Sequence, residues 1–103
     1  DDRLHLDAVH GRLLMRPPQA LAGLIEVRGL GIVRLPYEPF AVAHLVVDLA
    51  APDAVRLPDL SAMLTEIERV RLARLPVAAG ANALPLLTAF CHIAQTDGTR
   101  PQP

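Results

Sequence analysis

Glu26-Val27-Arg28-Gly29-Leu30-Gly31-Ile32-Val33 is the stretch that decides how this sequence is interpreted. Alternate residues of an extended strand share a face, so we expect Glu26 and Arg28 to project together from an otherwise apolar segment. Charges in an apolar strand lower its stability unless they are paired or used. Gly29 and Gly31 remove side chains where a backbone or a ligand comes close. The pattern predicts a site for a metal ion and a phosphate; a buried strand with one structural ion pair is the alternative.

The composition limits the class of protein. The chain has 103 residues, of which 51% are hydrophobic, which suits one small domain with a core. A net charge of -1 predicts no nucleic-acid partner. No apolar run approaches the roughly 20 residues of a membrane span, and no secretory leader is visible, so we expect a cytoplasmic protein without a membrane partner. Cys91 is the single cysteine, so no intrachain disulfide can form.

The basic residues carry a second constraint, because all ten are arginines. A Walker A loop uses a lysine to reach the phosphates, so these 103 residues cannot contain an intact one. The chain also starts at Asp1 and not at methionine. Together these observations predict a fragment that begins after a nucleotide-binding loop.

The hydrophobic pattern predicts several strands and few helices. Strands are expected over residues 3–9, 12–15, around Glu26, 41–49 and 70–75, the first two forming a hairpin. Helices are expected over residues 18–24, from Asp59 or Ser61 to Glu68, and over residues 82–94. We expect residues 1–96 to form the folded portion and residues 97–103 a flexible tail.

The segment Leu24–Arg34, LIEVRGLGIVR, resembles the hallmark motif of the HPr kinase/phosphorylase family almost residue for residue. The resemblance extends from Asp1 to about Ala94. It corresponds to the C-terminal part of the catalytic domain, in the short alphaproteobacterial type. It implies an α/β fold with a mixed sheet and few helices: a partial P-loop, PEP carboxykinase-like kinase domain that lacks the Walker A strand and loop.

The resemblance also implies roles for individual residues. Asp1 and Asp2 stand at the spacing of the family's Asp-Asp pair before the glycine motif. Asp2 is implied to be the acid/base that deprotonates the target serine of HPr, with Asp1 as its supporting partner. Glu26 is implied to bind Mg²⁺. Arg28 is implied to brace the site or to contact phosphate.

Two glycine-containing segments complete the resemblance. Gly29 and Gly31 are implied to contact the cofactor, ATP. The segment 75–82 is similar to the family's later loop, Pro-Val-X-Pro-Gly-X-Asn, which precedes an apolar helix. Ala78 and Ala81 stand where many members have basic side chains tied to dephosphorylation, so the resemblance leaves phosphorylase activity open. An ordinary strand-to-helix loop is the alternative for this segment.

The implied function is transfer of phosphate from ATP to a serine of the phosphocarrier protein HPr, in regulation of the phosphotransferase system and carbohydrate metabolism. The chain alone is expected to be inactive because the P-loop is missing. A non-catalytic module that binds HPr or a sister subunit is one alternative, and a structural remnant of a truncated gene is another. Open sheet edges predict a homo-oligomer.

Other charged residues receive weaker interpretations. His44 and Asp48 are four residues apart, and a surface histidine is favoured over a metal ligand. Arg69, Arg71 and Arg74 are expected to form a solvated basic face, with a docking surface for an acidic partner as the alternative.

Overall fold

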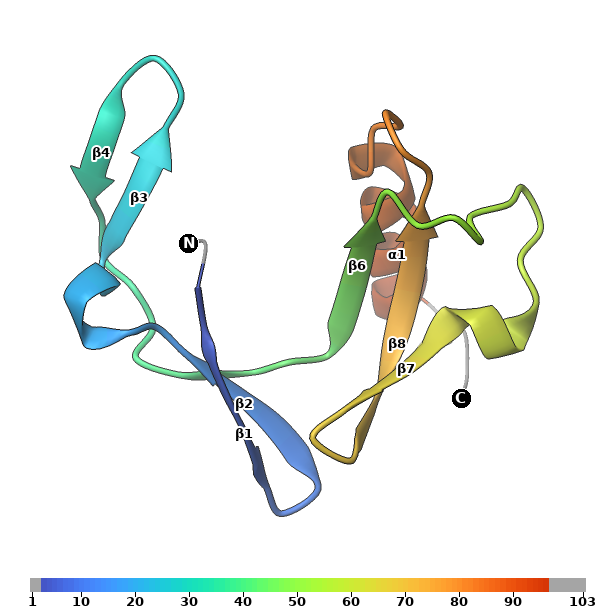
Figure 1. Cartoon of the computed structure of the whole chain (residues 1–103), viewed down its shortest axis with the longest axis horizontal. Helices are drawn as coiled ribbons and strands as arrows, with labels where there is room; N and C mark the ends of the chain where they lie inside the picture. The colour runs from blue at the N-terminus through green and yellow to red at the C-terminus, as the bar shows by residue number, and fades with distance from the viewer. Residues whose placement is uncertain (1–2, 97–103) are drawn as a thin grey trace. The chain divides into compact units, whose positions relative to one another are not determined.

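The computed structural model describes residues 3–96, which form two compact units (Figure 1). The first unit holds the residues up to Ala43 together with Glu68–Val70, and the second holds His44–Ile67 together with the residues from Arg71 onward. Asp1, Asp2 and the tail expected over 97–103 lie outside the described residues. Each unit is described by itself below.

A three-stranded antiparallel sheet forms part of the first unit, with strand order β1-β2-β5. β1 (His5–Val9) and β2 (Arg12–Arg16) form the expected hairpin, and β5 (Ala41–Val42) pairs with the other edge of β2. The turn at His10 and Gly11 has positive φ at both residues, 52° and 77°. Such a turn matches the twist of a hairpin, which explains why this predicted element was confirmed.

The motif segment of the first unit is a second hairpin, formed by β3 (Leu24–Val27) and β4 (Gly31–Arg34). The amide of Leu30 donates a hydrogen bond to the carbonyl of Val27 across the turn (2.8 Å). Gly29 and Gly31 both have φ of 90°. The expectation that this stretch continues as one strand is wrong, because the two glycines supply the backbone conformations that reverse the chain.

The connections around this hairpin differ in detail from the sequence pattern. The short helix expected over residues 18–24 is a single turn of 3-10 helix, η1 (Gln19–Leu21). The apolar run 41–49 is divided between β5 in the first unit and β6 (Leu45–Leu49) in the second. The run therefore contributes to two different sheets instead of one buried strand.

The second unit is built on a three-stranded sheet with strand order β6-β8-β7. β6 runs parallel to β8 (Val70–Val77), with a register from Leu45 opposite Ala73 to Leu49 opposite Val77. The side chains of Leu72, Leu75 and Val77 are buried and form the centre of this unit's core. Parallel strands are normally buried on both faces, and β8 shows this in its nearly continuous burial.

The helix expected from Asp59 or Ser61 to Glu68 is wrong. A single 3-10 turn, η2 (Leu60–Met63), is followed directly by β7 (Leu64–Ile67). Glu68 and Arg69 then return the chain into β8 with positive φ at both residues, 50° and 63°. The hairpin pairs β7 with β8, and this tertiary pairing overrides the local helical preference of a segment too short to be a stable helix by itself.

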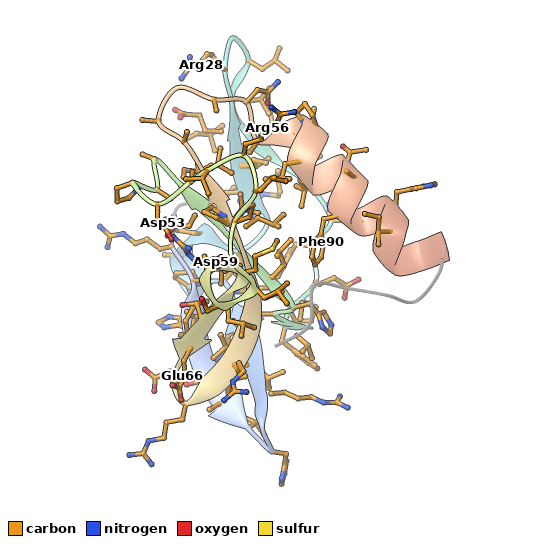
Figure 2. The ribbon with its side chains drawn as sticks, turned by 90° about the vertical axis from the view of Figure 1, so that its right-hand side faces the viewer. Arg28, Asp53, Arg56, Asp59, Glu66 and Phe90 are labelled. Atoms are coloured by element: carbon orange, nitrogen blue, oxygen red, sulfur yellow. The ribbon has the colours of Figure 1, made fainter. Side chains whose placement is uncertain are left out.

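The C-terminal helix is confirmed as α1 (Leu84–Thr96). The side chain of Asn82 accepts a hydrogen bond from the amide of Leu84 (3.0 Å), which satisfies one of the free amides at the helix start. Pro85 lies in the first turn, where its missing N–H costs nothing. Leu87 and Phe90 are half-buried and lie on one face of the helix. In Figures 1 and 2, α1 lies to one side of the β6–β8 strands.

The described residues contain eight strands, two 3-10 helices and one α-helix. This composition of elements, with both parallel and antiparallel pairing, confirms the expected α/β class with a mixed sheet and few helices. Within residues 3–96, no helix combines the length and the apolar character that crossing a bilayer requires.

Candidate functional site

The carboxylate of Glu26 lies on the exposed side of β3, opposite Ile32 of β4. Its neighbours in the strand, Ile25 and Val27, are half-buried on the other side, as strand alternation predicts. Among residues 3–96, no side chain forms an ion pair or hydrogen bond with Glu26. The carboxylate is therefore available to a cation or to a charged group from outside the described residues.

Arg28 lies in the turn between β3 and β4, at the end of the hairpin (Figure 2). Because β3 ends at Val27, Arg28 lies outside the strand, and strand alternation does not determine which face its side chain occupies. Arg28 is exposed and has no ion-pair partner within the described part of the chain. Glu26 and Arg28 are both exposed, and they form no ion pair with each other. These two observations exclude the alternative of a structural ion pair inside a buried strand.

The two glycines of the motif are required by the turn. A φ of 90° is a conformation that L side chains rarely adopt, and a Cβ added at Gly29 or Gly31 would meet no atom within 4 Å. The space over both glycines is open, so their backbone is accessible from solvent. Contact of these glycines with a nucleotide stays a prediction.

Glu26 fits one part of a magnesium site. Mg²⁺ in kinases is commonly bound by one or two carboxylates, with the remaining positions filled by water and substrate phosphates. Within residues 3–96, no group of three or more His, Cys, Asp or Glu side chains could hold a metal ion. Asp1 and Asp2, the other implied site residues, lie outside the described residues. Glu26 can thus supply one carboxylate to such a site.

A cluster around Arg74 of β8 was not anticipated. Nε and Nη2 of Arg74 donate to Oδ2 of Asp48 (3.1 Å and 2.8 Å), and Nη1 and Nη2 donate to Oδ2 and Oδ1 of Asp53 (2.9 Å and 2.8 Å). Nη1 also donates to the carbonyl of Ala62 (2.8 Å). A guanidinium has five N–H donors, so every donor of Arg74 is engaged. The expectation that Arg74 is solvated is wrong.

The electrostatics of this cluster follow from those contacts. The Arg74 side chain is only 14% exposed, whereas Asp48 and Asp53 are about half exposed. The hydrogen bond from Arg74 lowers the pKa of Asp53, and the two carboxylates, Asp53 first, raise the pKa of Arg74. Asp53 and Ala62 belong to the connection between β6 and β7, so their hydrogen bonds with Arg74 hold this connection against strand β8 (Asp53 is labelled in Figure 2). Asp48 is engaged there by Arg74, and His44 is exposed, as expected of a surface histidine.

The later loop that the sequence singled out is a simple turn. β8 continues through Val77, and the amide of Ala81 then donates to the carbonyl of Ala78 (3.0 Å). Gly80 adopts a positive φ of 77°. The loop therefore keeps its glycine and its capping asparagine, but it presents no charged side chain at either alanine.

Comparison with known proteins defines the class of this fold. No protein-family model and no curated protein matches the sequence. Among solved structures, the chain is similar to the Hpr(Ser) kinase/phosphatase from Coxiella burnetii, with a TM-score of 0.61 and 21% sequence identity. The similarity covers 82% of this chain and 61% of that chain, so the present chain spans about three fifths of that protein. The resemblance inferred from the motif is thus confirmed at the level of the fold, which is that of an HPr kinase.

Proposed function

We propose that this chain is the C-terminal portion of the catalytic domain of an HPr serine kinase. The complete domain transfers phosphate from ATP to a serine of HPr in the cytoplasm. The proposal rests on one combined observation. The motif LIEVRGLGIVR forms an exposed hairpin, and the chain that contains it has a fold similar to that of the Coxiella protein. Neither the sequence motif nor the fold alone would support the proposal as well.

The proposed chemistry assigns separate tasks to three residues. Phosphoryl transfer depends mainly on positioning and on neutralising charge. Asp2 would accept the proton from the serine hydroxyl of HPr, which leaves the oxygen free to attack phosphorus. Glu26 would hold Mg²⁺, which neutralises phosphate charge when bound. Arg28, at the end of a hairpin with open space beside Gly29, would contact a phosphate oxygen.

These 103 residues contain no lysine, so the proposal assigns the nucleotide loop to another segment of the complete domain. We therefore expect no phospho-HPr when the 103-residue chain is incubated with ATP, Mg²⁺ and HPr, as measured by intact mass spectrometry. The gene product extended upstream to include a nucleotide loop should phosphorylate HPr. Turnover by the short chain alone would overturn this part of the proposal.

The assigned residues are tested in that longer product. Glu26→Gln and Asp2→Asn should each lower kcat/KM by about 100-fold or more, because each removes a group needed in the transition state. Glu66→Gln is a matched control, since Glu66 is also the exposed third residue of a four-residue strand, β7. Asp59→Asn is the control for Asp2. Binding of HPr without turnover, insensitive to both variants, would favour a binding module instead.

A homo-oligomer is part of the same proposal. Among residues 3–96 the β3–β4 sheet has only two strands, so no described strand pairs with either outer edge, and a two-stranded sheet is marginally stable alone. Ile32 of β4 is 71% exposed on this hairpin. Self-association would cover these edges and this side chain.

A further inference from the structure

A cavity of about 290 Å³ lies at the base of the β3–β4 hairpin, entirely within the first unit. Its wall comes from the residues before β1, from the region of η1, from the start of β3 and from the chain just after β4. Most of the wall is apolar, formed by Leu4, Pro17, Leu21, Leu24, Ile25 and Leu35. The cavity is separate from the exposed carboxylate and the turn to which the proposed function assigns chemistry, because it is lined by none of those residues.

One side of this cavity is closely built. The amide of Leu35 donates a hydrogen bond to the carbonyl of Gly23 (2.8 Å), which extends the hairpin ladder to the cavity. Gly23 has φ of 78°, and a Cβ there would come within 3.1 Å of the Tyr37 ring and 3.3 Å of the Leu35 carbonyl. The Tyr37 ring therefore packs directly against the Gly23 backbone. This wall depends on a glycine and on a backbone hydrogen bond, so its shape is defined by the fold.

Two opposite charges line the same cavity. Arg3 precedes β1, and Glu38 follows β4. Among residues 3–96, neither side chain has an ion-pair or hydrogen-bond partner. An apolar hollow whose lining also includes an arginine and a glutamate without partners among the described residues complements a ligand with an apolar body and two opposite charges.

We propose that this cavity binds a free α-amino acid with an apolar side chain. The ligand's carboxylate pairs with the guanidinium of Arg3, its ammonium group pairs with the carboxylate of Glu38, and its side chain packs against Leu21 and Leu24. A volume near 300 Å³ is at the lower end of small-molecule sites, which suits a ligand of this size. An apolar side chain of a partner protein would lack the two charges.

The site would influence the motif hairpin through direct contact. Ile25, in the cavity wall, precedes Glu26 in β3, and Leu35 immediately follows β4. A ligand in the cavity contacts the base of both strands. Binding itself requires no phosphate transfer, so a failure of this inference and a failure of the proposed function are distinguishable.

Isothermal titration calorimetry of the 103-residue chain tests the ligand class. L-leucine and L-phenylalanine should bind saturably with one site per chain. Two compounds serve as controls: glycine lacks the apolar body, and N-acetyl-L-leucine amide lacks both charges. Each should bind at least about ten-fold more weakly than L-leucine, because each loses a contact that contributes about a factor of ten to the affinity. Absence of saturable heat with L-leucine overturns the proposal. Equal binding of N-acetyl-L-leucine amide also overturns it, in favour of a partner's side chain.

Variants test the two charges. Arg3→Gln and Glu38→Gln should each weaken L-leucine binding by about ten-fold or more, the loss expected for one charge-assisted hydrogen bond. Arg12→Gln and Glu66→Gln are matched controls at exposed strand positions outside the cavity, and both should leave the Kd unchanged. Circular dichroism melting confirms that each variant is folded. An unchanged Kd in both cavity variants would contradict the assignment.

Discussion

Arg74 is the residue whose environment departs most from its sequence context. Arginine has a planar fork of donors, so one side chain can bind two carboxylates and a carbonyl at once. Arg74 does this with Asp48, Asp53 and Ala62, which come from three separate segments. Lysine has a single charged nitrogen on a flexible stem and cannot reproduce this arrangement. Arg74 therefore anchors the fold and has no donor left for a phosphate.

We expect Arg74→Lys to lower the melting temperature clearly more than Arg71→Lys. The two arginines lie on the same strand, but Arg71 is exposed and has no ion-pair partner within residues 3–96. The same substitution at Arg71 removes no described contact, so it measures the effect of the side-chain change alone. Differential scanning fluorimetry compares the two variants. Equal melting temperatures would show that the cluster around Arg74 contributes nothing measurable.

Leu75 is among the most enclosed side chains described, with 1% of its surface exposed. Leu75→Ala removes buried methyl groups and leaves a cavity, so it should lower the free energy of unfolding by about 2–5 kcal/mol. Leu57→Ala is the control, because Leu57 is 86% exposed and its truncation should change stability by less than about 0.5 kcal/mol. Urea unfolding followed by circular dichroism measures both. A small effect at Leu75 would mean that this core is not formed in solution.

At the level of elements, the β3–β4 hairpin shows what its sequence could and could not reveal. Alternation correctly predicts that Glu26 is exposed while Ile25 and Val27 face the other way. The sequence pattern predicts space for a ligand at the two glycines, and the structure shows that they also reverse the chain. Because the turn begins at Arg28, alternation stops there. A period of two is reliable within a strand and carries no information beyond its end.

Gly29 offers a test of this turn. Gly29→Val should destabilise the hairpin by about 1–3 kcal/mol, because a β-branched residue is strained at φ of 90°. Since a Cβ at this position meets no neighbouring atom, the cost comes from the backbone alone. Gly29→Asn should cost less, because asparagine tolerates positive φ. Amide hydrogen exchange of β3 and β4 measures the difference. Equal exchange in the two variants would argue against a backbone origin.

The region from Asp59 to Glu68 has the local pattern of a helix but forms a strand in the structure. Leu60, Leu64 and Ile67 have the spacing of a helix face, yet Leu64–Ile67 forms β7. Glu68 and Arg69 adopt a positive φ that favours glycine or asparagine, so the local sequence does not indicate the turn. Pairing with β8 decides the outcome, and such pairing is a tertiary effect that local preference does not contain.

Elements with strong local determinants were predicted well. The first hairpin follows from His10-Gly11, and α1 follows from Asn82 and a proline in the first turn. The ion pair between Asp48 and Arg74 could not be predicted in the same way. It requires β6 and β8 to be parallel neighbours in register, and nothing in either segment alone specifies the other. For the candidate site, the motif identified Glu26 as exposed, but Asp1 and Asp2 lie outside the described residues.

At the scale of the whole molecule, the described part of the chain contains small cores and many exposed apolar side chains. The most enclosed large side chains are Leu13 in the first unit and Leu75 in the second. Leu30, Ile32 and Leu57 are each more than two thirds exposed. Small cores give a small margin of stability. This margin is the reason that ion pairs such as that of Asp53 should be visible in global unfolding.

Acid should reveal the contribution of Asp53. Its hydrogen bond from Arg74 lowers its pKa in the folded state, so the stabilisation is present above the ordinary aspartate value of about 4 and is lost as the pH falls through the lower, folded value. Asp53→Asn should therefore lower the urea midpoint at pH 7 and reduce its decline below about pH 4. Asp59→Asn is the control, since its side chain makes no capping hydrogen bond. If the urea midpoint declined identically below about pH 4 in the wild type and in Asp53→Asn, the pairing of Asp53 with Arg74 would be contradicted.

The parallel pairing of β6 with β8 also fixes an order of events during translation. Leu45 pairs with Ala73, so β6 leaves the ribosome without a partner and waits for most of the intervening chain to be synthesised. The β1–β2 hairpin has no such delay, because its strands are joined by two residues and hairpins close within microseconds. During translation the two strands of the β1–β2 hairpin can therefore meet early, while the apolar strand β6 still lacks its partner β8.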